Sequence, residues 1–195
     1  MQRKTSCLKV LAIFCLLIIF QACSSVSQKS IESYTDKVLY LQNNIHAQKG
    51  PRDGKASYAN WTDPGAGHYI IPVNTPVKFG RYRRGLTIES MADGSITYFE
   101  FNASNMRMGA DEYIELIASP QKADLNALSD IDRKGVQDGK AYIGMSKEGV
   151  RMALGYPAPH RTPFLDGNTW IYWRNRWKTL AVEFGDDQQV KSIEP

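Results

Sequence analysis

Few side chains in this sequence could carry out catalytic chemistry. It contains three cysteines and three histidines. The histidines, His46, His68 and His160, lie in unrelated surroundings and match neither the H-E-x-x-H pattern of zinc peptidases nor the G-x-S-x-G pattern of serine hydrolases. No nucleophile, base and orienting group can be recognised together. We therefore expect a protein that is not an enzyme, with no catalytic residue, no metal site and no cofactor.

Two other polar stretches have simpler explanations than ligand binding. Residues Gly65 to His68 are rich in glycine but lack the spacing and the lysine of a phosphate-binding loop. Asp186-Asp187 is not part of a D-x-D-x-D-G calcium loop. We interpret the first stretch as a flexible turn before a strand and the second as a hairpin turn.

Cys23 is the cysteine whose surroundings suggest a reaction. Arg3 and Lys4 form a short basic region, and the apolar segment 10–20 that follows is too short to span a bilayer comfortably. Ala22 then precedes Cys23 as in a bacterial lipobox, although Phe20 stands where that motif usually has leucine. We predict a lipoprotein signal peptide over residues 1–22, with diacylglycerol and palmitate attached at Cys23.

The remaining cysteines agree with that interpretation. Cys7 and Cys15 lie inside the signal, so the mature chain keeps one thiol and cannot form an internal disulfide. The alternative is an uncleaved N-terminal anchor helix with an incidental cysteine. Both interpretations place the folded part outside the cytoplasmic membrane. Because Ser24, not aspartate, follows the cysteine, we expect an outer-membrane lipoprotein facing the periplasm.

The charge of the mature chain excludes one class of partner. The whole sequence has 24 basic and 20 acidic residues, a net charge of +4. Three of the basic residues and none of the acidic ones lie in residues 1–22, which leaves 21 against 20. A nearly neutral chain gives no electrostatic reason to expect nucleic-acid binding. The expected contacts are the membrane, through the lipid, and an envelope protein.

The N-terminal third begins with a tether and a predicted helix. Residues 23–30 are small and polar, typical of a linker. Ile31, Tyr34, Val38, Leu41 and Ile45 recur at steps of three and four, which predicts an amphipathic helix over residues 31–46. This helix would pack on its own domain or form a coiled-coil-like contact with a partner near the membrane.

The next segment, residues 56–118, is rich in short strands. The runs 69–73, 77–82, 86–91, 96–101 and 113–118 are β-branched or aromatic, and Asp93-Gly94 between two of them is a strong hairpin signal. Five short strands over about fifty residues favour a small closed or half-closed barrel of SH3-like size. A helix near residues 120–133, capped by Ser119 and begun by Pro120, would connect this β module to the rest.

A short capped helix comes next. Ser146 is a good N-cap, and Val150, Ala153 and Leu154 form one apolar face. Gly155 suits a C′ position with positive φ, and Pro157 prevents continuation. Three strands then follow at residues 169–173, 178–184 and 189–193.

This combination resembles a known family. The pattern G-M-S-x-x-x-V-x-x-x-L-G-x-P (Gly144 to Pro157), followed by W-x-Y (Trp170 to Tyr172) and V-x-F (Val182 to Phe184), resembles the SmpA/OmlA lipoproteins, the BamE-like domains. The resemblance covers roughly residues 135–195, and we assign residues 119–195 to such a domain. It implies an α+β fold in which two helices pack on a three-stranded antiparallel sheet. The whole chain would be an SH3-like β module followed by this domain.

The resemblance also implies a role. It favours a non-catalytic accessory scaffold in outer-membrane protein assembly or envelope integrity, with the β-barrel assembly machinery as one candidate partner. BamE-like folds are also similar to β-lactamase inhibitor proteins, so the alternative is a periplasmic binding or inhibitory module for an envelope enzyme or peptidoglycan.

The C-terminal hairpin holds the candidate partner-binding residues. A three-residue loop over residues 174–176 would place Trp173 opposite Trp177 and both off the core face, beside Arg174 and Arg176. The core face is then expected to hold Trp170, Tyr172, Leu180, Val182 and Phe184. An aromatic patch rimmed by cations suits a protein partner or a lipid headgroup. The alternative is that the β module or the 31–46 helix covers it.

Overall fold

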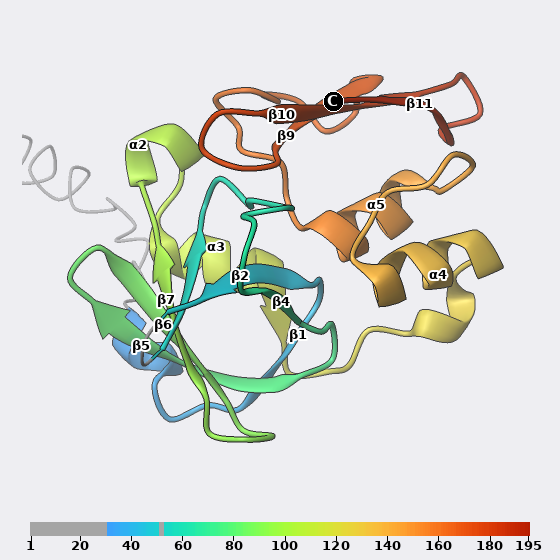
Figure 1. The fold of residues 1–195 in the computed structure, drawn as a ribbon. Coiled ribbons are helices and arrows are strands. Elements are labelled where there is room, and N and C mark those ends of the chain that lie inside the picture. Colours follow the sequence, from blue (N-terminus) through green and yellow to red (C-terminus); the bar gives the residue numbers. More distant parts are fainter. Residues whose placement is uncertain (1–30, 51–52) are drawn as a thin grey trace, which may run out of the picture.

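The computed structural model describes residues 31–50 and 53–195, and it is mostly β-sheet (Figure 1). The larger sheet has eight strands in the order β4-β2-β3-β7-β6-β5-β1-β8. Its neighbours pair antiparallel except β3 and β7, which are parallel. The strands are β1 (Leu39–Leu41), β2 (Ile45–Lys49), β3 (Gly54–Ser57), β4 (His68–Ile71), β5 (Pro76–Tyr82), β6 (Gly85–Ser90), β7 (Ile96–Glu100) and β8 (Ala118–Ser119).

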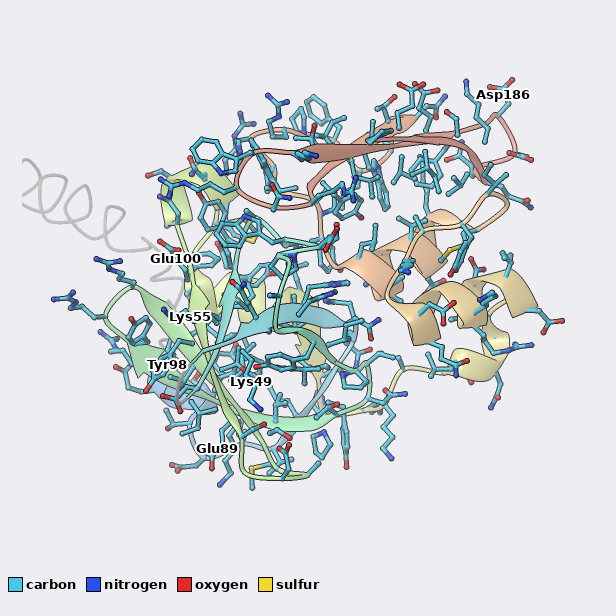
Figure 2. The ribbon with its side chains drawn as sticks, in the orientation of Figure 1. Lys49, Lys55, Glu89, Tyr98, Glu100 and Asp186 are labelled. Carbon is cyan, nitrogen blue, oxygen red and sulfur yellow. The ribbon has the colours of Figure 1, made fainter. Side chains whose placement is uncertain are left out.

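The central strands of this sheet follow the alternation of their sequence. In β7, Thr97 and Phe99 are buried while Ile96, Tyr98 and Glu100 point outward. Figure 2 labels Tyr98 and Glu100 of β7 together with Lys55 of the neighbouring strand β3. The predicted Asp93-Gly94 turn is present between β6 and β7, where Gly94 has a φ of 71°.

The curled sheet encloses the first hydrophobic core together with α3 (Ala110–Ile117). The ring of Tyr113 lies 5.4 Å from the ring centroids of both Phe99 and Phe101. The fully buried large side chains of this core include Leu41, Ile45, Phe79, Leu86, Ile88, Phe99, Met106, Tyr113, Ile114 and Ile117. Met106 comes from the short helix α2 (Ala103–Met106).

The predicted helix over residues 31–46 is wrong. Only Ile31–Tyr34 is helical, as the 3-10 turn η2, and β1 and β2 follow it. Asn44 explains the difference. Its backbone N–H donates to Met152 O (2.8 Å), its amide nitrogen donates to Val136 O (2.7 Å), and its amide oxygen accepts from Val73 N (2.9 Å). Three bonds to distant segments hold this stretch in place between β1 and β2, and the period-two burial of Leu39 and Leu41 outweighs the helical spacing.

Two further element predictions are corrected. Residues 113–118, predicted as a strand, lie mostly in α3, because Tyr113, Ile114 and Ile117 share one helical face and Glu112 caps the N–H of Gly109. The helix predicted over residues 120–133 is instead the 3-10 turn η3 (Leu125–Ala127) followed by α4 (Asp130–Asp138). Ser129 is the N-cap that Ser119 was expected to be.

The capped helix of the C-terminal region is confirmed as α5 (Lys147–Leu154). Ser146 Oγ accepts from Gly149 N at 3.0 Å, and Gly155 has a φ of 81°. Beyond it, β9 (Thr169–Trp173), β10 (Thr179–Phe184) and β11 (Val190–Glu194) form a second, antiparallel sheet in the order β11-β10-β9. The second core between these elements includes Val150, Leu154, Trp170, Tyr172, Val182 and Phe184.

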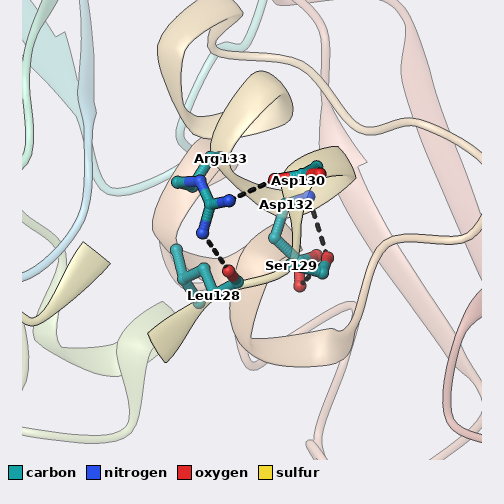
Figure 3. A network of polar contacts seen from close by, with 5 residues as sticks. All are labelled: Leu128, Ser129, Asp130, Asp132 and Arg133. Atoms are coloured by element: carbon teal, nitrogen blue, oxygen red, sulfur yellow. Dashed lines mark hydrogen bonds and ion pairs between the residues drawn. The ribbon is translucent and has the colours of Figure 1, made fainter. Parts of the chain in front are cut away.

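A buried carboxylate joins the two helices α4 and α5. Asp132, 3% exposed, accepts from Ser129 Oγ (2.8 Å), Ser146 N (2.8 Å) and Ser146 Oγ (3.0 Å). Both serines are N-caps, so one side chain fixes two helix starts. Figure 3 shows the Ser129–Asp132 contact beside Arg133, whose guanidinium bonds the carbonyl of Leu128 and the carboxylate of Asp130.

The predicted architecture, an SH3-like β module followed by a BamE-like domain of two helices on three strands, is wrong. The observed chain is mostly sheet, eight curled mixed strands plus three, with four short α-helices in the part that the structure describes. The carbonyls of Met152 and Ala153 in α5 accept from Asn44 and His46 of the larger sheet region. Helix α5 therefore packs on both sheets, and β8 straddles the predicted boundary at residues 118/119.

Candidate functional site

Part of the predicted site cannot be placed. The signal peptide, the lipid-attachment residue Cys23 and the tether all lie outside the described residues. Within residues 31–50 and 53–195, no helix combines the length and apolar character needed to cross a bilayer.

Trp177 is placed where the partner-binding prediction needs it, although the predicted register is wrong. The β9–β10 loop spans residues 174–178, so Trp173 pairs with Thr179 and Trp177 lies in the loop itself. Trp177 is 81% exposed. Asn175 Oδ1 accepts from the N–H groups of Trp177 (3.0 Å) and Lys178 (3.1 Å), an Asx-type turn that fixes the loop.

Arg176 completes the exposed tip of the hairpin. Its guanidinium lies 5.1 Å from the ring centroid of Trp177, a cation–π distance. Neither Arg176 nor Lys178 forms an ion pair with a residue that the structure describes. Trp177, Arg176 and Lys178 thus present a large aromatic ring and two uncompensated cations.

Trp173 is half-buried, and a loop covers part of its ring. Its backbone carbonyl also accepts from Thr62 N, in the predicted β module. His160 stacks on its ring at 6.4 Å, and Arg161 lies over it at 5.6 Å. Burial lowers the pKa of His160, and the nearby charges of Arg161 and Arg107 lower it further. We define the hairpin surface as Arg161, Trp173, Arg176, Trp177 and Lys178.

Arg174 does not belong to this surface. Its guanidinium pairs with Asp63 at 3.1 Å. Beside this ion pair, Thr62 N donates to Trp173 O (2.9 Å) and Asp63 N donates to Arg174 O (2.8 Å). These contacts join the outer edge of β9 to the loop before β4. Arg174 therefore ties the two sheets together.

A pair of histidines was missed by the sequence reasoning. His46 Nδ1 and His68 Nε2 are 3.0 Å apart, and the rings stack with centroids 5.3 Å apart. Burial lowers the pKa of His46 to about 4, while its bond to Ala153 O opposes the shift. The pairing of β2 with β4 brings the two together, and no spacing in the sequence signals it.

The pair adjoins an open cleft between the two sheets. The cleft has a volume of about 600 Å³. Its lining includes His68, Ile70, Lys140, Arg174, Leu180 and Ile193. The ring of His160 stacks on Trp173 instead. No group of three or more metal-ligating side chains occurs among residues 31–50 and 53–195.

Comparison of the chain with protein-family models, curated proteins and solved structures gave no match.

Proposed function

We propose that this chain is a non-catalytic lipoprotein, anchored at Cys23 to the outer membrane and facing the periplasm, that binds an envelope protein through the hairpin surface. It would act as an accessory scaffold in outer-membrane protein assembly or envelope integrity. The observation that carries the proposal is Trp177, 81% exposed on a hydrogen-bonded turn beside Arg176. A ring this exposed buries little apolar surface in the fold, and tryptophan and arginine are among the residues enriched at binding hot spots.

The charge of the surface indicates the chemistry of the partner. Arg161, Arg176 and Lys178 have no ion pair among the described residues, so an acidic surface would complement them. The role in assembly comes from the sequence resemblance over residues 135–195. Since the overall fold departs from that family, the structural support for binding is the hairpin surface alone.

Photocrosslinking in intact cells tests the proposal. The full-length lipoprotein would carry benzoylphenylalanine in place of Trp177, or in place of Val38, which is 45% exposed just before β1. We expect position 177 to give one discrete adduct with an envelope protein and position 38 to give none. The β-barrel assembly machinery in that adduct would support the assembly role, and an envelope enzyme would support the inhibitory alternative. No adduct, or the same adduct from both positions, would contradict the proposal.

A further inference from the structure

The cleft between the two sheets has the size and surface of a small-molecule site. Its volume of about 600 Å³ lies in the range of ligand pockets, ~300–1,000 Å³. Four parts of the chain line it: the segment from the loop before β4 into that strand, the end of α4 with the connection that follows, the last residue of α5, and the β9–β11 region. The Asp63–Arg174 ion pair lies in this lining and joins two of the four parts.

One portion of the lining is apolar. Ile70, Leu154, Leu180 and Ile193 all line the cleft, and Leu154 is 1% exposed overall. Leu154 belongs to the second core, and Leu180 and Ile193 pack against it. Such an apolar wall suits the hydrocarbon part of a ligand, because covering it removes apolar surface from water and stabilises the complex.

The charges of the lining leave one cation without a partner. Asp63 and Arg174 neutralise one another. Asp138 pairs with Lys134 at 2.5 Å and accepts from Tyr142 Oη at 2.7 Å. Lys140 has neither an ion pair nor a side-chain hydrogen bond with the described residues. The charge of Lys140 also lowers the pKa of Asp138, but no acidic group among the described residues lies within ion-pair distance of its ammonium, so the cleft can accept a single negative charge.

The hydrogen bonds of the histidine pair determine which nitrogen of His68 can respond to an anion. Because His46 Nε2 lies 2.9 Å from the carbonyl of Ala153, it must carry the proton, and His46 Nδ1 is an acceptor. His68 Nε2–H must then donate to it across 3.0 Å. The second nitrogen of His68, Nδ1, has no bond in the described structure and carries no proton in the neutral ring.

The surroundings of His68 keep it neutral when the cleft is empty. Burial lowers its pKa, the charge of Asp63 raises it, and the charge of Lys140 lowers it. Arg174 and Asp138 also line the cleft, each held in its own ion pair, and His46 behind the ring is neutral. An anion beside Lys140 would remove the repulsion between Lys140 and a protonated His68, and His68 could then take up a proton.

We propose that this cleft binds a small hydrophobic anion, a carboxylate or a phosphomonoester with an apolar body. The ammonium of Lys140 contacts the anionic group, Ile70, Leu180 and Ile193 contact the apolar body, and His68 takes up a proton at Nδ1 and donates to the anion. This site is separate from the hairpin surface and does not depend on the proposed function.

Calorimetric titration of the full-length lipoprotein in phosphatidylcholine nanodiscs tests the proposal. The probes are 4-phenylbutanoate, 4-phenylbutyl phosphate and, as the neutral control, 4-phenylbutanol. We expect at least one anion to bind saturably and the alcohol to bind about tenfold more weakly, the effect of losing one charge-assisted hydrogen bond. Preference between the two anions identifies the headgroup chemistry.

Variants distinguish specific binding in the cleft from nonspecific binding. Lys140→Gln should weaken anion binding about fivefold or more, as for a partly exposed charge, whereas Lys191→Gln, whose ammonium pairs with Glu183 instead, should not change it. Binding of 4-phenylbutanoate, whose own charge stays constant in this range, should tighten severalfold between about pH 8 and pH 6. His68→Gln should remove that pH dependence. Absence of saturable anion binding, or equal binding by the Lys140→Gln protein, would overturn the proposal.

Discussion

His46 lies in β2 and is 2% exposed. Its imidazole bonds the carbonyl of Ala153 in α5. Burial lowers its pKa from 6.5 to about 4. In the unfolded chain the His46 imidazole therefore binds a proton near pH 6.5, whereas in the folded chain it binds one only near pH 4. The stability that comes from keeping His46 neutral is complete above pH 6.5 and is lost as the pH falls toward 4.

We therefore expect acid to destabilise the fold through this residue. Between about pH 7.5 and pH 4, His46 should account for a loss of roughly 2–3 kcal/mol in the free energy of unfolding. Urea unfolding at several pH values should show a flatter dependence for His46→Gln than for the natural protein. His160→Gln, at a surface residue whose ring is only partly covered, should keep most of the dependence. Identical curves for the His46 variant and the natural chain would contradict the buried neutral imidazole.

Two tryptophans of the same hairpin should respond oppositely to truncation. Trp170 is 3% exposed, its ring lies 4.9 Å from that of Phe184, and its Nε1 donates to Leu165 O. Trp170→Ala should lower the free energy of unfolding by ~3–5 kcal/mol. Trp177→Ala should change it by less than about 0.5 kcal/mol. Thermal melts check both, and a stable Trp170→Ala protein would mean that the register of β9 and β10 is wrong.

At the scale of elements, the link between α4 and α5 depends on one carboxylate. Asp132→Ala would leave donors from Ser129 and Ser146 without their acceptor in a buried site. We expect a loss of ~2–4 kcal/mol in the free energy of unfolding, measured by urea titration. Asp130→Ala is the matched control, because that side chain is 96% exposed and its pair with Arg133 should contribute less than about 1 kcal/mol. Equal losses for both variants would refute the bridging role.

Elements with complete local signals could be predicted from the sequence. Helix α5 has its cap, apolar face and terminating glycine within eleven residues, Ser146 to Tyr156, and it forms as expected. The sequence signal for the turn at Asp93-Gly94 likewise lies in adjacent residues. Segment 31–46 has a helical spacing of apolar residues, yet Asn44 bonds residues 73, 136 and 152, and these distant partners decide its conformation.

The candidate site also contains some residues that could be predicted from the local sequence and some contacts that could not. Trp177 and Arg176 could be chosen from the sequence, because a tryptophan between two basic residues in a hairpin loop is unusual for a core. Arg174 was chosen with them, but Asp63, 111 residues away, pairs with it. The His46–His68 contact depends on the pairing of β2 with β4. No local pattern carries information about either contact.

At the scale of the whole molecule, attachment to the membrane depends on Cys23. Cys23→Ser removes the thiol that would accept diacylglycerol, so the precursor should stay unlipidated and uncleaved at residue 22. Mass spectrometry of the N-terminal peptide and membrane fractionation measure this. Cys15→Ser, inside the signal, should be lipidated normally. Normal processing and anchoring of the Cys23→Ser protein would refute the lipobox prediction.

The two sheets are joined through α5, and the tip of the β9–β10 hairpin is exposed. Loss of the hairpin tip should therefore affect binding while the fold stays intact. The residues to change are Trp177 and Arg176, which are both exposed.

Co-purification of the envelope partner with tagged, full-length protein tests the central claim most directly. The natural chain, a Trp177→Ala/Arg176→Gln variant and a Lys191→Gln control would be purified from solubilised membranes at matched expression. A hot spot worth ~2 kcal/mol corresponds to about a thirtyfold weaker complex. We predict that the double variant loses the partner while its melting temperature stays unchanged and the control retains it. Equal recovery of the partner by all three proteins would contradict the assignment of the hairpin surface.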